Sequence, residues 1–174
     1  LVDVDLGMRY LEAGSLKATD SLVIPEIILP VCNPQYLADV VQGKGRKQVP
    51  TLISMDNQDR GWAAAFETSG RADNTLVFSD YAVVVQAALL GQGIALGWLN
   101  VVSNSLCKGE LVPATDAIRV MSRRCCLVVP GNRPVRPVVE QVRDWIIEEM
   151  RADLLAIDAL YPHLGLAATL QSTP

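Results

Sequence analysis

The chain has 174 residues, of which half are hydrophobic and a fifth are charged. This size and composition predict a globular protein with a true core, as one ordinary domain or two small lobes, and exclude a disordered tail. The formal net charge of −4 gives no reason to expect binding to nucleic acid or to acidic membranes, so any contact with DNA would need a part that this sequence lacks.

The first elements that the pattern predicts are short strands. Aliphatic and acidic residues alternate over residues 2–6 and predict a strand that ends near Arg9. Residues 22–31 are rich in β-branched side chains and bounded by prolines, which predicts an extended segment. Pro34 follows it and suits the first turn of a helix over residues 35–41.

The rest of the chain continues the alternation of strands and helices. The predicted strands are residues 51–54, 76–78, 94–96, 111–112 and 125–129. The predicted helices are residues 61–68 before Gly70, 81–90 before Gly91, 100–107 before Gly109 and 138–155, with a weaker helix at most after residue 156. In the longest helix Val139, Val142, Trp145, Ile146 and Met150 are expected near one face. The alternation predicts the α/β class with one or two mostly parallel sheets.

The cysteines give no metal or cofactor site. They stand at Cys32, Cys107, Cys125 and Cys126, without CxxC spacing, and His163 is the only histidine. We therefore expect no metal and no cofactor. The adjacent pair at 125 and 126 lies in an apolar run, which favours small buried side chains in a reducing cytoplasm over the alternative of a redox pair.

The chain predicts neither a membrane span nor a leader peptide. Its longest apolar segment, residues 81–90, is shorter than the ~18–20 residues that a span requires. The first seven residues do not form a signal peptide. The sequence lacks an initiator Met and opens in the middle of a predicted strand, so we expect a piece of a longer protein.

No nucleophile elbow, phosphate loop or dinucleotide motif is present in the sequence. The start of the helix at Ser79 is more informative, because its free N–H groups, partly capped by the Ser79 side chain, can hold an anion if they face a cleft. An ordinary N-cap by Ser79 or Asp80 on a core helix is the simpler alternative. Gly93 and Gly97 bracket a strand and predict close backbone approach or tight turns, and Trp98 after it is either core or a ligand-facing wall.

Seven segments, in order, resemble the effector domains of LysR-type transcriptional regulators, particularly the glycine-cleavage-activator-like subgroup. The longest is FSDYAVVVQAALLGQGIALGW, residues 78–98. The others are VDVDLGMRY (2–10), ILPVCNPQYL (28–37), GWAAAF (61–66), GELVP (109–113), and CLVVP (126–130) with DWI (144–146). The resemblance covers roughly residues 2–150.

The resemblance implies a fold like that of type II periplasmic binding proteins, with two α/β lobes joined by two crossover segments near residues 24–31 and 123–130. Lobe one would comprise residues 1–24 and 129–174 and be incomplete at its N-terminus, and lobe two residues 25–128. A small effector would bind in the cleft between the lobes. A winged helix-turn-helix absent from this chain would bind DNA, and effector domains would pair in homodimers or homotetramers. Residues 151–174 are an extension beyond the family pattern.

Carried over to this chain, the resemblance implies ligand contacts from both lobes: Arg9, Tyr10, Ser79, Asp80, Tyr81, Gly97 and Trp98. Arg9 is either a carboxylate partner or a structural ion pair with an acid such as Asp5 or Glu12. Residues 57–62 lie in a loop that can reach the ligand, and within this loop we expect Trp62 to pack in the core rather than to contact the ligand. An aromatic box for a quaternary ammonium, made with Tyr10, Tyr81 and Trp98, is a further alternative.

The function expected from these residues is reversible sensing of a small polar metabolite, a carboxylate or amino-acid-like compound, and not catalysis. A solute-binding protein of a transporter is the alternative that shares the fold, and the four cysteines and missing signal peptide count against it. A third alternative is an enzyme built on the same two-lobe architecture, but the sequence contains none of the motifs that characterise such enzymes.

Overall fold

The computed structural model describes residues 4–43, 49–55, 74–131 and 134–171. The chain divides into two compact units: unit 1 comprises Leu1–Ile27 and Val120–Pro174, and unit 2 comprises Ile28–Arg119. The chain passes between the units within strand β2 (Ser21–Cys32) and at the start of strand β7 (Arg119–Val128). The helix predicted over residues 61–68, with Trp62, lies outside the described residues.

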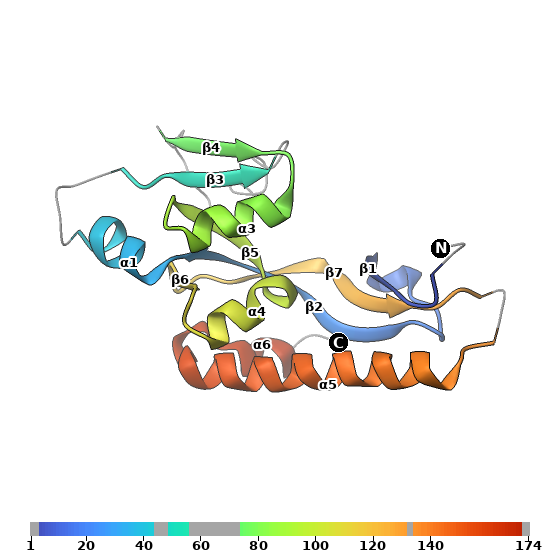
Figure 1. Cartoon of the computed structure of the whole chain (residues 1–174). Helices are drawn as coiled ribbons and strands as arrows, with labels where there is room; N and C mark the ends of the chain where they lie inside the picture. Colours follow the sequence, from blue (N-terminus) through green and yellow to red (C-terminus); the bar gives the residue numbers. More distant parts are fainter. Residues whose placement is uncertain (1–3, 44–48, 56–73, 132–133, 172–174) are drawn as a thin grey trace. The chain divides into compact units, whose positions relative to one another are not determined.

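Unit 1 combines antiparallel strands with a long C-terminal helix (Figure 1). Strand β1 pairs with β7 in antiparallel register, and β7 lies next to β2. In chain order the elements are β1 (Gly7–Glu12), the 3-10 helix η1 (Ala13–Ser15), β2 (Ser21–Cys32), β7 (Arg119–Val128), α5 (Pro137–Leu160), the 3-10 helix η3 (Pro162–Leu164) and α6 (Leu166–Gln171). Helix α6 folds back against α5.

Helix α5 buries a narrower stripe than its sequence suggested. Val139, Met150 and Ile157 are buried, because they are separated by eleven and seven residues, close to whole numbers of turns. Trp145 is 59% exposed and Val142 is 42% exposed, and Trp145 is the residue whose predicted place on this face is wrong. Six residues rotate Trp145 roughly 120° away from Val139 on an α-helix.

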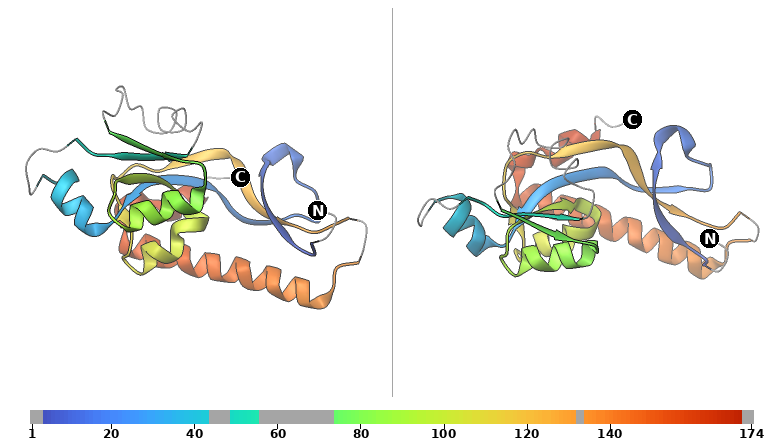
Figure 2. Two further views of the ribbon diagram at one scale, coloured as in Figure 1. Left: turned by 45° about the horizontal axis from the view of Figure 1, so that its top comes forward. Right: turned by 90° about the horizontal axis from the view of Figure 1, so that it is seen from above.

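Unit 2 is built on the second half of β2 and four further strands. The strand order is β2-β5-β3-β4, and β6 pairs with the end of β2. The elements are α1 (Pro34–Tyr36), the π-helix η2 (Leu37–Val41), β3 (Leu52–Met55), β4 (Thr75–Phe78), α3 (Tyr81–Leu89), β5 (Ile94–Trp98), α4 (Leu99–Cys107) and β6 (Val112–Pro113). Figure 2 shows β3 and β4 side by side, and α3 packs on β3, β4 and β5.

The strand directions are mixed, not mostly parallel as predicted. Strand β3 runs parallel to β4 and β5, whereas β5 and β6 run antiparallel to β2, and β1 antiparallel to β7. The alternation of strands and helices indicated parallel crossovers correctly for β3, β4 and β5. It gave no signal for β2, which pairs with strands that follow it much later in the chain.

Small polar residues and glycines fix the path of unit 2. The Asn33 side chain caps α1 by accepting from Gln35 N at 2.8 Å, and its Nδ2 donates to Leu89 O at 3.0 Å, which ties the end of β2 to the end of α3. Gly91 has a φ of 72° directly after α3, a left-handed conformation that glycine adopts without strain. The predicted helix end is therefore confirmed.

Candidate functional site

Of the two capping side chains that the sequence offered, Asp80 and not Ser79 caps α3. Asp80 Oδ1 accepts from Ala82 N at 2.7 Å, and α3 begins two residues later than Ser79. Both side chains are exposed. Because a carboxylate already stands at the first N–H groups of α3, a second anion there would meet like charge.

Tyr81 joins the start of α3 to the end of β5 in unit 2. Its hydroxyl donates to Leu96 O at 3.0 Å and accepts from Trp98 N at 2.9 Å. Its ring also meets the Trp98 ring edge-on, with centroids 5.0 Å apart. These contacts satisfy backbone groups and hold the two predicted ligand aromatics as one rigid pair.

Trp98 packs against the core of unit 2 while remaining partly exposed. Its half-buried side chain lies on a cluster of Ile28, Cys32, Ile94 and Leu96 with Ala114. This answers in part the question left open by the sequence, since Trp98 has core contacts. Part of the Trp98 side chain stays exposed, and a role of that part as a wall of the ligand site stays a prediction.

Gly97 serves close packing. A Cβ added to it would lie 3.0 Å from Val102 Cγ2 on α4 and 3.0 Å from Val31 Cγ2 on β2. Gly93 is closer still, because its added Cβ would lie 2.5 Å from Thr51 O. The prediction of close backbone approach is confirmed at Gly93, whereas Gly97 is buried between valine side chains of its own unit.

The two predicted residues of unit 1 lie next to each other on β1. Arg9 is exposed and Tyr10 is half-buried, opposite Cys126 and Cys125 of β7 respectively. The Asp5 carboxylate, one of the two acids considered as a partner of Arg9, pairs with Arg136.

A buried ion pair that sequence reasoning missed lies beside Tyr10. Glu26 on β2 has a fully buried side chain, and both its carboxylate oxygens accept from Arg123 on β7, at 2.8 Å from Nε and 2.7 Å from an Nη. The Arg123 guanidinium also lies over the Tyr10 ring, 5.3 Å from its centroid. The hydrogen bonds to Glu26 raise the pKa of Arg123, which stays cationic.

Three adjacent strands therefore bring Tyr10, Arg123 and Glu26 together. The only sequence signal was a single acid, Glu26, inside an apolar run, and its partner is 97 residues away. Spacing along the chain could not reveal it.

The family of the chain follows from a match to the LysR substrate binding domain over residues 3–151. The chain belongs to this family. It is 25% identical over 161 residues to the HTH-type transcriptional regulator DsdC of Escherichia coli K12, covering 85% of this chain and 51% of that protein. It is 26% identical over 157 residues to the glycine cleavage system transcriptional activator of the same strain, covering 87% and 51% respectively. The chain thus spans about half the length of these curated relatives.

Solved structures of LysR-family domains share the fold. The AmpR effector binding domain from Citrobacter freundii is similar with a TM-score of 0.59 and 17% identity, over 86% of this chain and 76% of that chain. The CrgA regulatory domain from Neisseria meningitidis gives 0.56 and 16%, over 86% and 76%. The resemblance to LysR effector domains with their type II binding-protein-like fold is thereby confirmed, and these relatives give no support to the transporter alternative.

The thiols of this LysR-family chain are protected where they are buried. Cys32, Cys125 and Cys126 are free and buried, and Cys107 is half-buried. Burial raises the pKa of Cys32 to about 11 and that of Cys125 to about 12, and also raises the pKa of Cys126. A thiol held protonated is a poor nucleophile. The structure therefore supports small buried side chains over a redox pair.

Ser54 on β3 is a second residue that sequence reasoning passed over. Its Oγ is buried and has no hydrogen-bond partner among the residues that the structure describes. By register, β3 Ile53 lies opposite β5 Ala95, so Ser54 neighbours Leu96 on the face that carries Trp98.

No helix in the described ranges is both long and apolar enough to cross a membrane.

Proposed function

We propose that this chain is the greater part of the effector-binding domain of a bacterial LysR-type transcriptional regulator, and that it is a binding module rather than an enzyme. The match to the LysR substrate binding domain over residues 3–151 carries the proposal. The curated relatives, which are transcriptional regulators, are about twice as long as the part that aligns with this chain. We assign DNA binding to a winged helix-turn-helix of the full-length protein, which acts in the cytoplasm.

The ligand that we propose is a small amino-acid-like metabolite, bound in the cleft between lobes that the family resemblance implies. The exposed guanidinium of Arg9 suits a carboxylate. The exposed carboxylate of Asp80, at the start of α3, suits an ammonium group. An amino acid carries both charges. Tyr10, Ser79, Tyr81, Gly97 and Trp98 are assigned to the same site.

Calorimetry of the full-length regulator against a panel of amino acids and organic acids tests this assignment. We expect saturable binding of an amino-acid-like compound. Arg9→Met should weaken it about tenfold or more, the loss of one charge-assisted hydrogen-bonding partner. Lys17→Met, at another exposed cation of the same unit, is the matched control and should change nothing. Binding of apolar compounds alone, or equal affinities of the two variants, would contradict the proposal.

We further propose that the regulator is a homodimer or homotetramer through its effector domain. Gel filtration with light scattering at several concentrations gives the mass directly. A monomer at all concentrations, with and without the effector, would refute this part of the proposal and leave ligand binding unaffected.

A further inference from the structure

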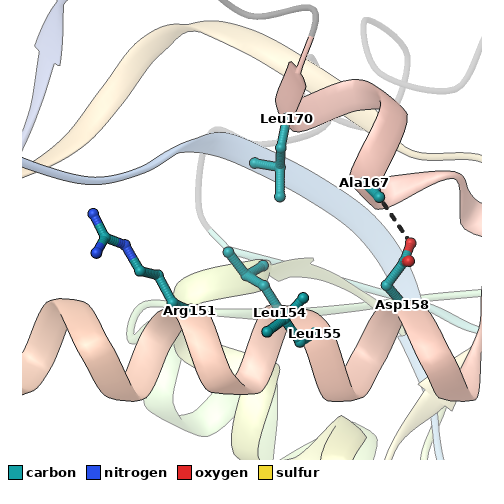
Figure 3. A pocket seen from close by; sticks show the side chains of 6 residues that line it. All are labelled: Arg151, Leu154, Leu155, Asp158, Ala167 and Leu170. Carbon is teal, nitrogen blue, oxygen red and sulfur yellow. Dashed lines mark hydrogen bonds between the residues drawn. The ribbon is translucent and has the colours of Figure 1, made fainter.

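Helices α5 and α6 enclose a pocket at the C-terminal end of unit 1. Its volume is about 310 Å³. Figure 3 shows the six side chains that line it: Arg151, Leu154, Leu155, Asp158, Ala167 and Leu170. The family match ends at residue 151. Arg151 is thus the last residue of the family match, and the other five lining residues follow it in the chain.

The sequence of the extension builds this pocket directly. The four α5 positions are spaced by three, four and seven residues from Arg151, which puts them on one face of the helix. Gly165, with a φ of 62°, reverses the chain after η3. Asp158 Oδ1 then accepts from Ala167 N at 3.1 Å and holds the first turn of α6 on α5.

Helix α5 packs against both η3 and α6. Ile157, Leu164 and Leu166 are almost fully buried. Leu155 by contrast is 73% exposed, so its side chain is open to contact with a bound hydrocarbon.

The two ends of the pocket differ in charge. In Figure 3 the Arg151 guanidinium lies at one end of the apolar walls, and the Asp158 carboxylate lies at the other. Within the described residues Arg151 forms no ion pair. Seven residues of helix separate the two, roughly 10 Å along the axis. A guanidinium binds a carboxylate well, whereas Asp158 repels a second anion.

We propose that this pocket binds a small apolar monocarboxylate. Arg151 holds the carboxylate, the hydrocarbon body covers Leu154, Leu155 and Leu170, and Asp158 excludes dicarboxylates. The volume lies at the lower end of the range for small-molecule sites, which suits a short chain or a single ring. This site is separate from the effector site proposed above and does not depend on it.

Octanoate is the probe for the test, with octanol and octanedioate as its uncharged and doubly charged counterparts. On the full chain, NMR titration or calorimetry should give saturable binding of octanoate and at least tenfold weaker binding of both counterparts. Equal binding of octanol, or no saturable binding of octanoate, would overturn the proposal.

Variants separate the parts of the proposal. Arg151→Met keeps the apolar stem and should weaken octanoate at least tenfold, whereas Arg143→Met, on α5 outside the pocket, should leave it unchanged. Leu155→Asp, at an exposed position, should abolish binding without unfolding the chain, as checked by circular dichroism. Asp158→Asn keeps the acceptor for Ala167 N and should bring octanedioate close to octanoate. Wild-type affinity in Arg151→Met would refute the assignment. Arg9→Met should not change octanoate binding, which keeps this test distinct from that of the effector.

Discussion

Replacing Arg123 by methionine is expected to destabilise unit 1 more than replacing Glu26 by glutamine, although both changes break the same ion pair. The Glu26 side chain is 0% exposed and that of Arg123 is 46% exposed. Arg123→Met leaves a buried carboxylate without its bidentate partner, which costs about 3–5 kcal/mol. Glu26→Gln leaves a guanidinium that water can reach, and the loss is about 1–2 kcal/mol.

Urea denaturation followed by circular dichroism measures this difference. With a slope on the order of 2 kcal/mol per molar urea, Arg123→Met should lower the midpoint by roughly 1.5–2.5 M and Glu26→Gln by roughly 0.5–1 M. Arg143→Met breaks an ion pair with Asp144 at the surface and serves as the control, with no measurable shift expected. Equal shifts for the two variants of the buried pair would refute the argument from unequal burial.

Three further predictions concern the packing, the helix start and the thiols. Gly97→Ala should lower the free energy of unfolding by about 1–3 kcal/mol, because its Cβ would lie 3.0 Å from two valine methyl groups; an unchanged urea midpoint would contradict this. Asp80→Ala removes the cap of α3 and should cost about 1 kcal/mol in the same assay, whereas Asp80→Asn should cost less. Cys32 and Cys125 should resist thiol reagents at pH 8. If reagents labelled them faster than the chain unfolds globally, the prediction that burial protects them would be wrong. Burial raises the pKa of Cys32 to about 11 and that of Cys125 to about 12, above the ~8.5 of an unfolded thiol. The stability that these protonated thiols contribute is therefore complete below pH ~8.5 and is lost as the pH rises through their folded-state pKa values. The urea midpoint should fall between pH ~8.5 and about 12.

Elements with strong local signals could be predicted from the sequence. The β-branched run before Asn33 became β2, and the capped apolar run between Asp80 and Gly91 became α3. The first strand was predicted too early, because alternation over residues 2–6 suggested pairing there. The pairing of β1 with β7 begins at Gly7 instead. A strand's limits depend on its partner, which local alternation does not contain.

The candidate site was predicted less completely, for a similar reason. The family motif indicated Tyr81 and Trp98, which the fold of unit 2 does bring into contact. The sequence offered both Ser79 and Asp80 as caps, and local pattern alone could not choose Asp80 between them. Nor could it find Glu26 with Arg123, because an ion pair across 97 residues exists only once the strands have paired.

The buried ion pair between Glu26 and Arg123 also explains how the register of β2 is fixed. Residues 23–32 of β2 are all buried, so a slip by one residue would still put apolar side chains on both faces. Glu26 is the exception, because a slip would remove its carboxylate from Arg123. We expect that Glu26→Leu combined with Arg123→Met costs less stability than Arg123→Met alone, since buried ion pairs are often replaced by apolar groups without loss. The same double variant should show doubled backbone amide resonances from alternative pairings of β2 and β7. A single set of resonances with wild-type contacts between the strands would mean that the apolar packing and the turns already determine the register without the charges.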